Sequence, residues 1–404
     1  MNWRTRSEES WGRLDMKSNF ITKPLSLLAE IQTGPFGSQL HKEDYVDIGT
    51  PIVTVEHLGS KRFSEQNLPN VSDEDKERLS KYVLREGDIV FSRVGSVDRC
   101  SYVSEEYVGW MFSGRCLRVR PSAEIVPEYL YYYFTLETTK QFVRGIATGA
   151  TMPSINTKFM GEVPVTYPSI DIQRKIADIL GTIDRKIEVN NAINENLQAQ
   201  AQALYANMFI HNASDQWAEG VLSDVADIAM GQSPKGDTYN EDGVGTVFFQ
   251  GRGEFGFRFP TRRLFTTDPK RMAQSNDVLI SVRAPVGDLN VAYEPCCIGR
   301  GLGAIRSKDN HQSFVLYTVF SLREKLDMFN GEGTVFGSIN RDALNSMPII
   351  IPTKDELERF EEIVAPMDTA IRNNYEEICR LEAIRDSLLP RLMSGEIDVS
   401  NIQL

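Results

Sequence analysis

Two long stretches of the chain carry apolar residues at alternating steps of three and four. In the second stretch these positions run from Leu357 to Leu392. The equivalent positions 184 residues earlier, from Ile176 to Met208, show the same spacing, and each such set of positions is called a seam. This spacing gathers apolar side chains into one stripe along a helix, as in a coiled coil. We therefore predict two long helices, at residues 169–213 and 353–396.

Three polar or helix-breaking residues interrupt these seams. Pro366 removes a backbone hydrogen bond, so it predicts a kink or a late start of the second helix. Asn190 and Asn374 occupy the same place in the two seams. A buried asparagine fixes the register of a coiled coil, although a solvated edge of the seam is the alternative. Because the connections are short, we expect an antiparallel pair with Asn190 opposite Asn374 and Ile183 near Leu381.

The segments before the two helices consist of short apolar runs separated by Gly and Pro. The expected strands are Pro51–Val55, Asp88–Phe91 and Cys116–Val119 in the first segment, and Val247–Phe249, Asp277–Val282 and Leu302–Ile305 in the second. Helical patterns follow at Glu128–Phe142 and Ser313–Phe329. Each segment is of a size suited to one α+β core.

An internal duplication organises the whole chain. Ser154-Ile155-Asn156 recurs as Ser338-Ile339-Asn340, and the register holds without a gap for more than fifty residues. The fold class is therefore α+β, with two tandem mixed α/β domains that each precede a long helix, the helices forming an antiparallel coiled coil. The expected parts are an N-terminal arm (1–18), a first domain (19–168), a central helix (169–213), a second domain (214–352), a C-terminal helix (353–396) and a tail (397–404).

Composition narrows the class of protein. A chain of 404 residues exceeds the usual size of a single core. There is no uncharged apolar run of about 18 residues and no apolar leader, so we expect no membrane association and a cytoplasmic location. The five cysteines form no C-x-x-C pair and the four histidines are scattered, so no metal site is expected.

The charge is unevenly distributed. The net charge is −12, and residues 354–398 hold 12 acids against 6 bases, which is half of that excess. Residues 252–271 instead hold six bases and two acids. Such a stretch can face a phosphate backbone in an acidic protein, or it can be a solvated loop. Both interpretations stay open.

Five strings carry a resemblance to a known family: Leu25–Ile31, Asn276–Gly287, Ser338–Asn340, Pro348–Pro352 and Leu388–Ile397. As an ordered and duplicated set, they resemble the specificity subunit of type I restriction-modification systems, from about Leu25 to Val399. The resemblance implies two target recognition domains, each reading half of a split, asymmetric site in double-stranded DNA. It also implies that the helices act as a spacer and dock two methylation subunits, with restriction subunits joining the complex.

The resemblance implies a subunit with no catalytic residues and no cofactor of its own. S-adenosylmethionine, ATP and Mg would belong to the partner subunits. The sequence has no adenine-methyltransferase tetrapeptide and no phosphate-binding loop. Asp88 and Asp277 could be nuclease carboxylates, but a turn before a buried strand suits them better. A methyltransferase or nuclease with a degenerate motif, or a scaffold without DNA contact, are the competing functions.

Base recognition requires side chains that can reach the major groove. The candidates are Gly34, Ser38, Arg93 and Lys158 in the first domain, and Lys235, Arg252, Arg283 and Arg341 in the second. Arg93 and Arg283 form the best pair, because both come just after a matching strand; ion pairs with nearby acids are the alternative. Ser154–Asn156 and Ser338–Asn340 suit helix caps better than base readers.

Overall fold

The computed structural model describes residues 20–37, 39–283, 285–331 and 337–402, and it divides the chain into two compact units. Unit 1 comprises Met1–Ile187 with Cys379–Leu404, and unit 2 comprises Glu188–Ile378. Within the described ranges, every helix is too short or too polar to cross a membrane. The predicted N-terminal arm at 1–18 lies outside the described residues.

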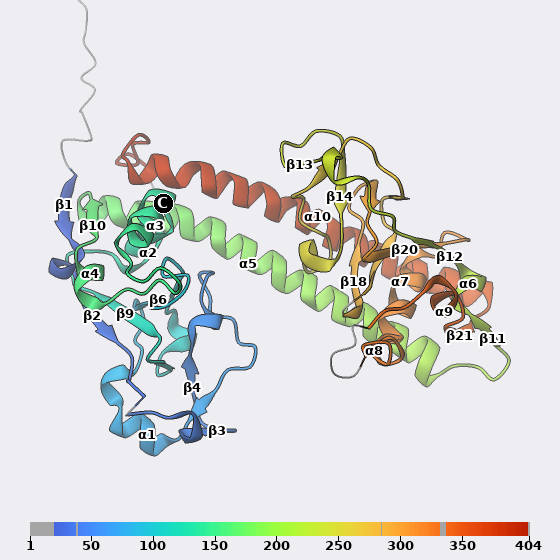
Figure 1. Ribbon diagram of the computed structural model, residues 1–404, viewed down its shortest axis with the longest axis horizontal. Helices are drawn as coiled ribbons and strands as arrows, with labels where there is room; N and C mark the ends of the chain where they lie inside the picture. The colour runs from blue at the N-terminus through green and yellow to red at the C-terminus, as the bar shows by residue number, and fades with distance from the viewer. Residues whose placement is uncertain (1–19, 38, 284, 332–336, 403–404) are drawn as a thin grey trace, which may run out of the picture. The chain divides into compact units, whose positions relative to one another are not determined.

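Unit 1 contains three small sheets (Figure 1). The central sheet is antiparallel, in the order β2 (Ala29–Thr33), β9 (Cys116–Pro121), β6 (Ile89–Ser92) and β7 (Cys100–Tyr102). The distal sheet has the order β3 (Tyr45–Val46), β5 (Asn70–Val71), β4 (Thr50–Val53) and β8 (Met111–Phe112). A two-stranded sheet pairs β1 (Ile21–Pro24) with β10 (Pro164–Tyr167).

Helices that follow β9 pack on the central sheet of unit 1 and lead into the first long helix, whereas the short helix before β6 lies beside the distal sheet (Figure 1). The helices of unit 1 are α1 (Asp73–Arg78), α2 (Pro127–Thr135), α3 (Glu137–Ile146), α4 (Thr157–Gly161) and, as far as Ile187, α5 (Ile170–Ala206), which a π-helical turn (Asn207–His211) extends. Phe91 of β6, Tyr129 of α2 and Leu180 of α5 belong to one buried cluster. The apolar stripe of the long helix is therefore buried against the domain that precedes it.

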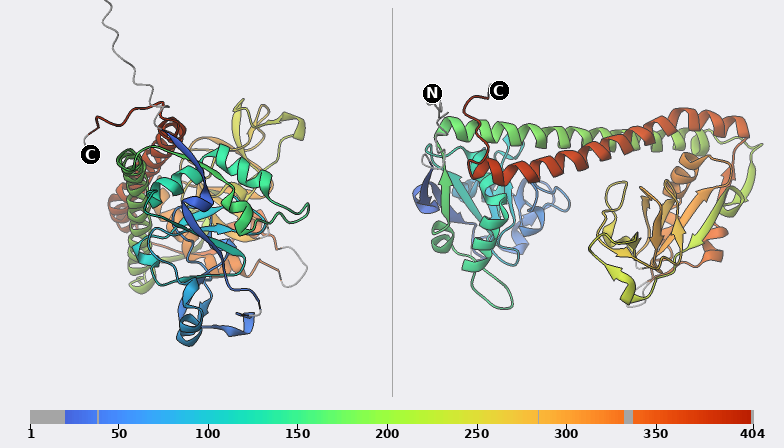
Figure 2. Two further views of the ribbon diagram at one scale, coloured as in Figure 1. Left: turned by 90° about the vertical axis from the view of Figure 1, so that its left-hand side faces the viewer. Right: turned by 90° about the horizontal axis from the view of Figure 1, so that it is seen from above.

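Unit 2 repeats this plan with one additional strand, β16, in its distal sheet (Figure 2). Its central sheet runs β12 (Ala226–Met230), β20 (Leu302–Ser307), β17 (Val278–Val282) and β18 (Val286–Val291). Its distal sheet runs β13 (Tyr239–Asn240), β15 (Phe265–Thr266), β14 (Thr246–Phe249), β19 (Cys296–Ile298) and β16 (Met272–Ala273), and β11 (Ala218–Val221) pairs with β21 (Pro348–Ile351). Its helices are α6 (Leu222–Val225), α7 (Gln312–Ser321), α8 (Arg323–Asp327), α9 (Arg341–Asn345) and, as far as Ile378, α10 (Lys354–Met393), whose last residues belong to unit 1. The two mixed α/β domains predicted from the repeat are confirmed.

The second long helix begins at Lys354 and not after Pro366. Helix α10 runs from Lys354 through Pro366 without a break, so the late start is wrong. Phe360, Val364 and Ile371 are fully buried in the core of unit 2. This apolar burial holds the helix together across the missing backbone hydrogen bond.

The predicted register of the helices is wrong by one turn. Inside unit 2, Asn374 donates to Asn194 Oδ1 at 2.8 Å, and Asn190 donates to Glu377 Oε2 at 2.8 Å. The contacts run in opposite directions along the two segments, but Asn190 and Asn374 do not pair with each other. Asn190 is buried and Asn374 is half-buried. Polar groups one turn further along satisfy these amides, because a buried amide needs a hydrogen-bond partner.

Candidate nucleic-acid interface

Several loops of unit 1 meet where the strands of the central sheet begin or end on one side, a site here called edge 1. Strands β2 and β6 end at this edge and β7 and β9 begin there, because neighbouring strands are antiparallel. The amide of Gly34 donates to Cys116 O at 3.2 Å, and that of Arg93 donates to Arg115 O at 2.8 Å. A bridge between Val94 and Ser154 brings the segment before α4 to the same place.

Unit 2 has the corresponding edge 2. Its loops are joined by hydrogen bonds from Val282 N to Gly301 O (2.9 Å) and from Gly301 N to Gln250 O (3.1 Å). Arg283 forms a bridge with Ser338, shortly before α9. The structure therefore brings the loops that carry Lys235, Arg252, Arg283 and Arg341 to one edge, although these residues are far apart in the sequence.

Gly34 has a packing role at edge 1. A Cβ atom there would lie 2.1 Å from the carbonyl oxygen of Ser113. Gly231 meets the same restriction at edge 2, where a Cβ would lie 2.1 Å from Gly299 O. Glycine is needed where two backbones approach this closely, and Gly34 is itself buried. Ser38 lies outside the described residues.

Arg93 and Arg283 occupy matching positions but differ in their surroundings. Arg93 is half-buried; its Nη1 donates to Gly114 O at 3.2 Å, and its guanidinium lies 5.5 Å from the centre of the Phe36 ring. Arg283 is exposed. Neither has a carboxylate within ion-pair distance among the described residues, so the alternative role in ion pairs finds no partner there. A role in DNA contact stays a prediction.

Three further arginines at these edges were not among the sequence candidates. Arg99 and Arg115 each precede a strand of edge 1, and Arg300 lies in the turn before β20 at edge 2. All three are exposed, and none forms an ion pair with a described carboxylate. Glycines flank two of them, as Gly114-Arg115 and Gly299-Arg300-Gly301. That short pattern was the available sequence signal.

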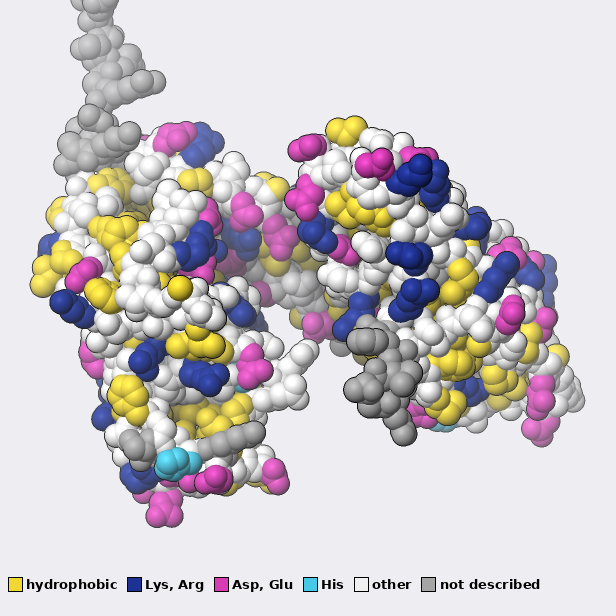
Figure 3. All heavy atoms as spheres, in the orientation of Figure 1, with side chains coloured by type: hydrophobic (Ala, Val, Ile, Leu, Met, Phe, Trp, Pro, Cys, Tyr) yellow, Lys and Arg dark blue, Asp and Glu magenta, His cyan; other side chains and the backbone are white. Residues whose placement is uncertain are grey.

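The basic stretch at 252–271 is largely neutralised. Its ion pairs are Arg252–Asp288, Arg258–Asp368, Arg262–Glu294, Arg263–Glu254 and Lys270–Asp268. On the face of unit 2 seen in Figure 3, Lys and Arg side chains alternate with Asp and Glu. The stretch does not offer four free positive charges to a phosphate backbone. Of its bases, Arg252 lies at edge 2 and its guanidinium is engaged by Asp288.

The remaining candidates are exposed and belong to short elements at the edges. Lys158 lies in α4, Arg341 begins α9 and Lys235 precedes a short 3-10 helix. The side chain of Asn156 accepts from Phe159 N at 2.9 Å, and the side chain of Asn340 caps α9 in the same way. The interpretation of the two Ser-Ile-Asn strings as helix caps is confirmed.

Asp88 and Asp277 are buried, and they form matching ion pairs with arginines. Arg120 donates to both oxygens of Asp88 at 2.7 Å, and Arg306 donates to those of Asp277 at 2.7 and 2.8 Å. Each aspartate also accepts a backbone amide three residues upstream, just before its strand. The turn interpretation is confirmed, since these carboxylates are fully occupied. Within the described ranges, no three His, Cys, Asp or Glu side chains are grouped to hold a metal ion.

The sequence is similar to a known protein family and to several of its members. The family described as the type I restriction modification DNA specificity domain matches residues 18–199 and again residues 214–383. The chain is 31% identical to the putative type I restriction enzyme MjaX specificity subunit of Methanocaldococcus jannaschii, over 89% of each chain. It is 23% identical to the HindI specificity subunit of Haemophilus influenzae, over 84% of this chain and 92% of that one.

A crystal structure of the type I restriction-modification S subunit from M. genitalium has the same fold. The TM-score is 0.59 at 16% identity, with 93% of this chain and 96% of that chain covered. The duplicated match accounts for the two copies of the domain, and the relatives match across both copies. The chain belongs to the family of type I restriction-modification DNA specificity subunits, which are DNA-binding and recognise DNA sequence.

Proposed function

We propose that the chain reads a bipartite, asymmetric DNA site, with edge 1 contacting one half-site and edge 2 the other. The observation that carries this proposal is the duplicated edge, at which arginines that have no carboxylate partner in the described part of the chain gather in both units. An arginine in an ion pair is already satisfied, whereas a free guanidinium can bind a guanine edge or a phosphate. Because the edge loops differ in sequence between the units, the two half-sites are expected to differ.

The long helices are proposed to form an antiparallel coiled coil that separates the half-sites. Helix α10 has 40 residues, which is about 60 Å at ~1.5 Å per residue. This length limits the separation of the half-sites to roughly 18 base pairs at ~3.4 Å per step. The same helices are proposed to dock two methylation subunits and, through them, restriction subunits. Membership of the family supports this part of the proposal.

Domain exchange tests the bipartite reading. Residues 219–352 are replaced by the matching domain of a relative, and the hybrid is expressed with its methylation subunit. Sequencing of methylated bases in the host genome then gives the recognised motif. We expect one half of the motif to change and the other half to remain. A change in both halves, or in neither, would contradict independent reading by the two units.

The alternative functions give different results in the same system. A chain that transfers methyl groups would do so alone when supplied with S-adenosylmethionine. A scaffold without DNA contact would leave the motif unchanged after domain exchange. Asp88 and Asp277 are each held in an ion pair with an arginine, which argues against a nuclease centre at those residues.

A further inference from the structure

Unit 1 holds a cation, a tyrosine and an aspartate in contact where its domain meets helix α5. Tyr132 of α2 donates its hydroxyl to Asp184 Oδ2 at 2.6 Å. The Nζ atom of Lys61 lies 3.1 Å from the Tyr132 hydroxyl and 3.9 Å from Asp184 Oδ2. The other oxygen of Asp184 accepts from Arg385 of α10 at 3.1 Å. Lys61, Tyr132 and Asp184 are called triad 1.

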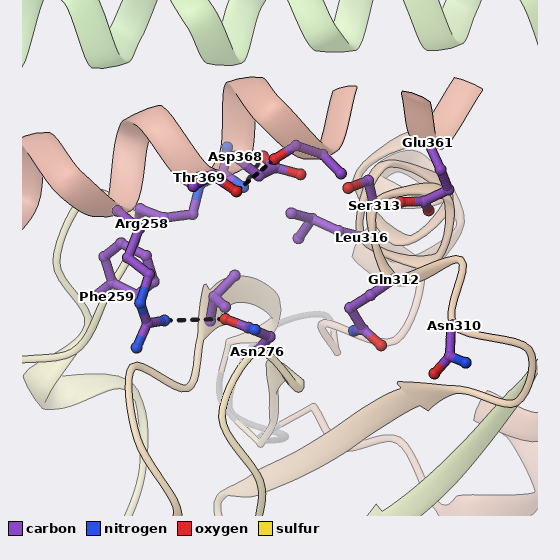
Figure 4. A pocket seen from close by; sticks show the side chains of 13 residues that line it. Arg258, Phe259, Asn276, Asn310, Gln312, Ser313, Leu316, Glu361, Asp368 and Thr369 are labelled. Atoms are coloured by element: carbon purple, nitrogen blue, oxygen red, sulfur yellow. Dashed lines mark hydrogen bonds and ion pairs between the residues drawn. The ribbon is translucent and has the colours of Figure 1, made fainter. Parts of the chain in front are cut away.

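Unit 2 contains the same arrangement, called triad 2. Tyr317 of α7 donates to Asp368 Oδ1 at 2.8 Å. Arg258 donates to the Tyr317 hydroxyl at 3.1 Å and to Asp368 Oδ1 at 3.1 Å. Figure 4 shows Arg258 reaching from its loop to Asp368 on α10.

The backbone shows that the two cations are equivalent. The carbonyl oxygen of Lys61 accepts from Tyr102 N at 2.9 Å, and that of Arg258 accepts from Val291 N at 2.8 Å. Tyr102 and Val291 are the last residues of β7 and β18, the matching outer strands of the central sheets. The triad is therefore a duplicated feature in which lysine in one copy replaces arginine in the other.

Each triad joins three elements of its own unit. The cation lies on the loop that follows β4 or β14, the tyrosine lies on α2 or α7, and the aspartate lies on α5 or α10. Tyr132 is 2% exposed and Tyr317 is 1% exposed. Burial raises the pKa of both tyrosines, so their hydroxyls stay protonated and can donate at neutral pH.

Directional hydrogen bonds of this kind restrict the angle between a domain and its long helix more tightly than apolar packing does. The long helices also pack on their domains through apolar side chains such as Leu180 and Val364. Apolar contact is non-directional, whereas a buried hydrogen bond needs its donor and acceptor in line. Rotating a domain on its helix would separate the tyrosine and the cation from the aspartate, which costs the hydrogen bonds of groups shielded from water, although Lys61 would keep its second ion pair with Glu128 of α2.

We propose that triads 1 and 2 are positioning residues that hold each reading domain at a fixed angle on its helix and so make the chain selective for one spacer length. The proposal rests on the bipartite reading proposed above. Adding one base pair moves a half-site by about 3.4 Å and rotates it by about 35° around the DNA axis. A domain held rigidly cannot follow this movement, whereas a domain that has lost its triad can.

The test uses Tyr132→Phe and Tyr317→Phe in the full chain assembled with its methylation subunits. Binding is measured on duplexes with the native spacer, with one base pair added or removed, and with a substituted base in each half-site. We expect the ratio of Kd between altered and native spacers to fall about tenfold in each variant, the scale of one hydrogen bond to a charged group. The penalty for a substituted base should stay as in the wild type.

Matched variants separate positioning from general damage. Tyr133→Phe removes the hydroxyl of the neighbouring residue, which donates to Pro164 O at 2.9 Å, away from the long helix; the spacer ratio should be unchanged. Lys61→Arg should retain the ratio and Lys61→Met should lose it. An unchanged ratio in both tyrosine variants, or equal loss of spacer and base discrimination, overturns the proposal.

The same measurements on the wild-type complex distinguish the positioning role of the triads from the bipartite reading on which it rests. If it penalises a substituted base in each half-site but tolerates a changed spacer, the positioning role is wrong and the bipartite reading stands. If it penalises no base substitution in one half-site, the bipartite reading itself fails, whatever the variants do.

Discussion

Replacing Arg283 by alanine is the most direct test of the reading surface. The side chain is exposed at edge 2 and has no carboxylate partner among the described residues. Its backbone is held by the bridge to Ser338 and by the bond from Ile339 N to Val282 O at 3.1 Å. Because the substitution leaves these bonds in place, we expect the stability of unit 2 to change by less than about 0.5 kcal/mol.

The effect on DNA binding depends on what the guanidinium contacts. A bidentate contact to a base is worth about 1–3 kcal/mol, so the loss is roughly 5- to 150-fold and restricted to one half-site. A phosphate contact would instead weaken binding to every sequence and reduce the salt slope by about one. Arg283→Lys separates the two, because lysine keeps the charge and loses the planar fork.

Arg263→Ala is the matched control, since it removes the same charge from the same unit. Arg263 is engaged by Glu254 and Glu241, so its removal should leave half-site discrimination intact. Affinity of the assembled complex is measured by fluorescence anisotropy at several salt concentrations, on cognate duplexes and on duplexes with one substituted base. Equal losses for Arg283→Ala and Arg263→Ala, or base penalties identical to the wild type, would refute the role of Arg283. Arg93→Ala is less clean, because it also removes the hydrogen bond to Gly114 O.

Three further outcomes are expected. Arg120→Met leaves the Asp88 carboxylate, which is 1% exposed, buried without its partner; it should cost about 3–5 kcal/mol, measured as lost hydrogen-exchange protection of β6. Arg306→Met likewise leaves the Asp277 carboxylate, which is 3% exposed, without its partner, but the cost in β17 should be smaller because half of that arginine faces water; a larger loss of protection in β17 than in β6 would contradict this reasoning. Burial raises the pKa of Glu361, so its contribution to stability is present below the ordinary pKa of glutamate and is lost as pH rises through the raised value. Glu361→Gln should therefore stabilise unit 2 at neutral pH and not in acid, as urea unfolding at several pH values would show. Burial raises the pKa of the Cys100, Cys116 and Cys296 thiols to about 12, whereas Cys379 is exposed. Iodoacetamide at pH 8 should therefore label the native protein once, at Cys379. A second label would contradict the burial of the other cysteines.

Elements with a strong internal period could be predicted from the sequence. The runs at Asp88–Phe91 and Asp277–Val282 became β6 and β17, which are buried along their whole length. Residues 169–213 were predicted as a helix, and α5 with its π-helical turn covers Ile170 to His211. In each case the local pattern agreed with the burial that the fold provides, so no distant information was needed.

The charges at the reading edges could not be predicted in this way. The run of bases at 252–271 looked free because its acids come from elsewhere, including Asp288, Glu294 and Asp368. Conversely, Arg115 became a neighbour of Arg93 only through the pairing of β6 with β9. A linear sequence reports net charge, but whether a given arginine is neutralised depends on tertiary contacts.

The register of the long helices failed for a more specific reason. A seam with apolar residues every three or four positions tolerates a shift of one turn, because apolar residues again face apolar residues. The polar groups therefore determine the register, and Asn374 donates a hydrogen bond to the side-chain oxygen of Asn194. The repeat places Ile378 at the position equivalent to Asn194, so Asn190 turns instead to the neighbouring Glu377. The two copies are thus related by the repeat but satisfied by different partners. A displacement of four residues is about 6 Å along the helix, or nearly two base-pair steps. Any spacer length argued from these helices must therefore start from the polar contacts and not from the symmetry of the apolar seam.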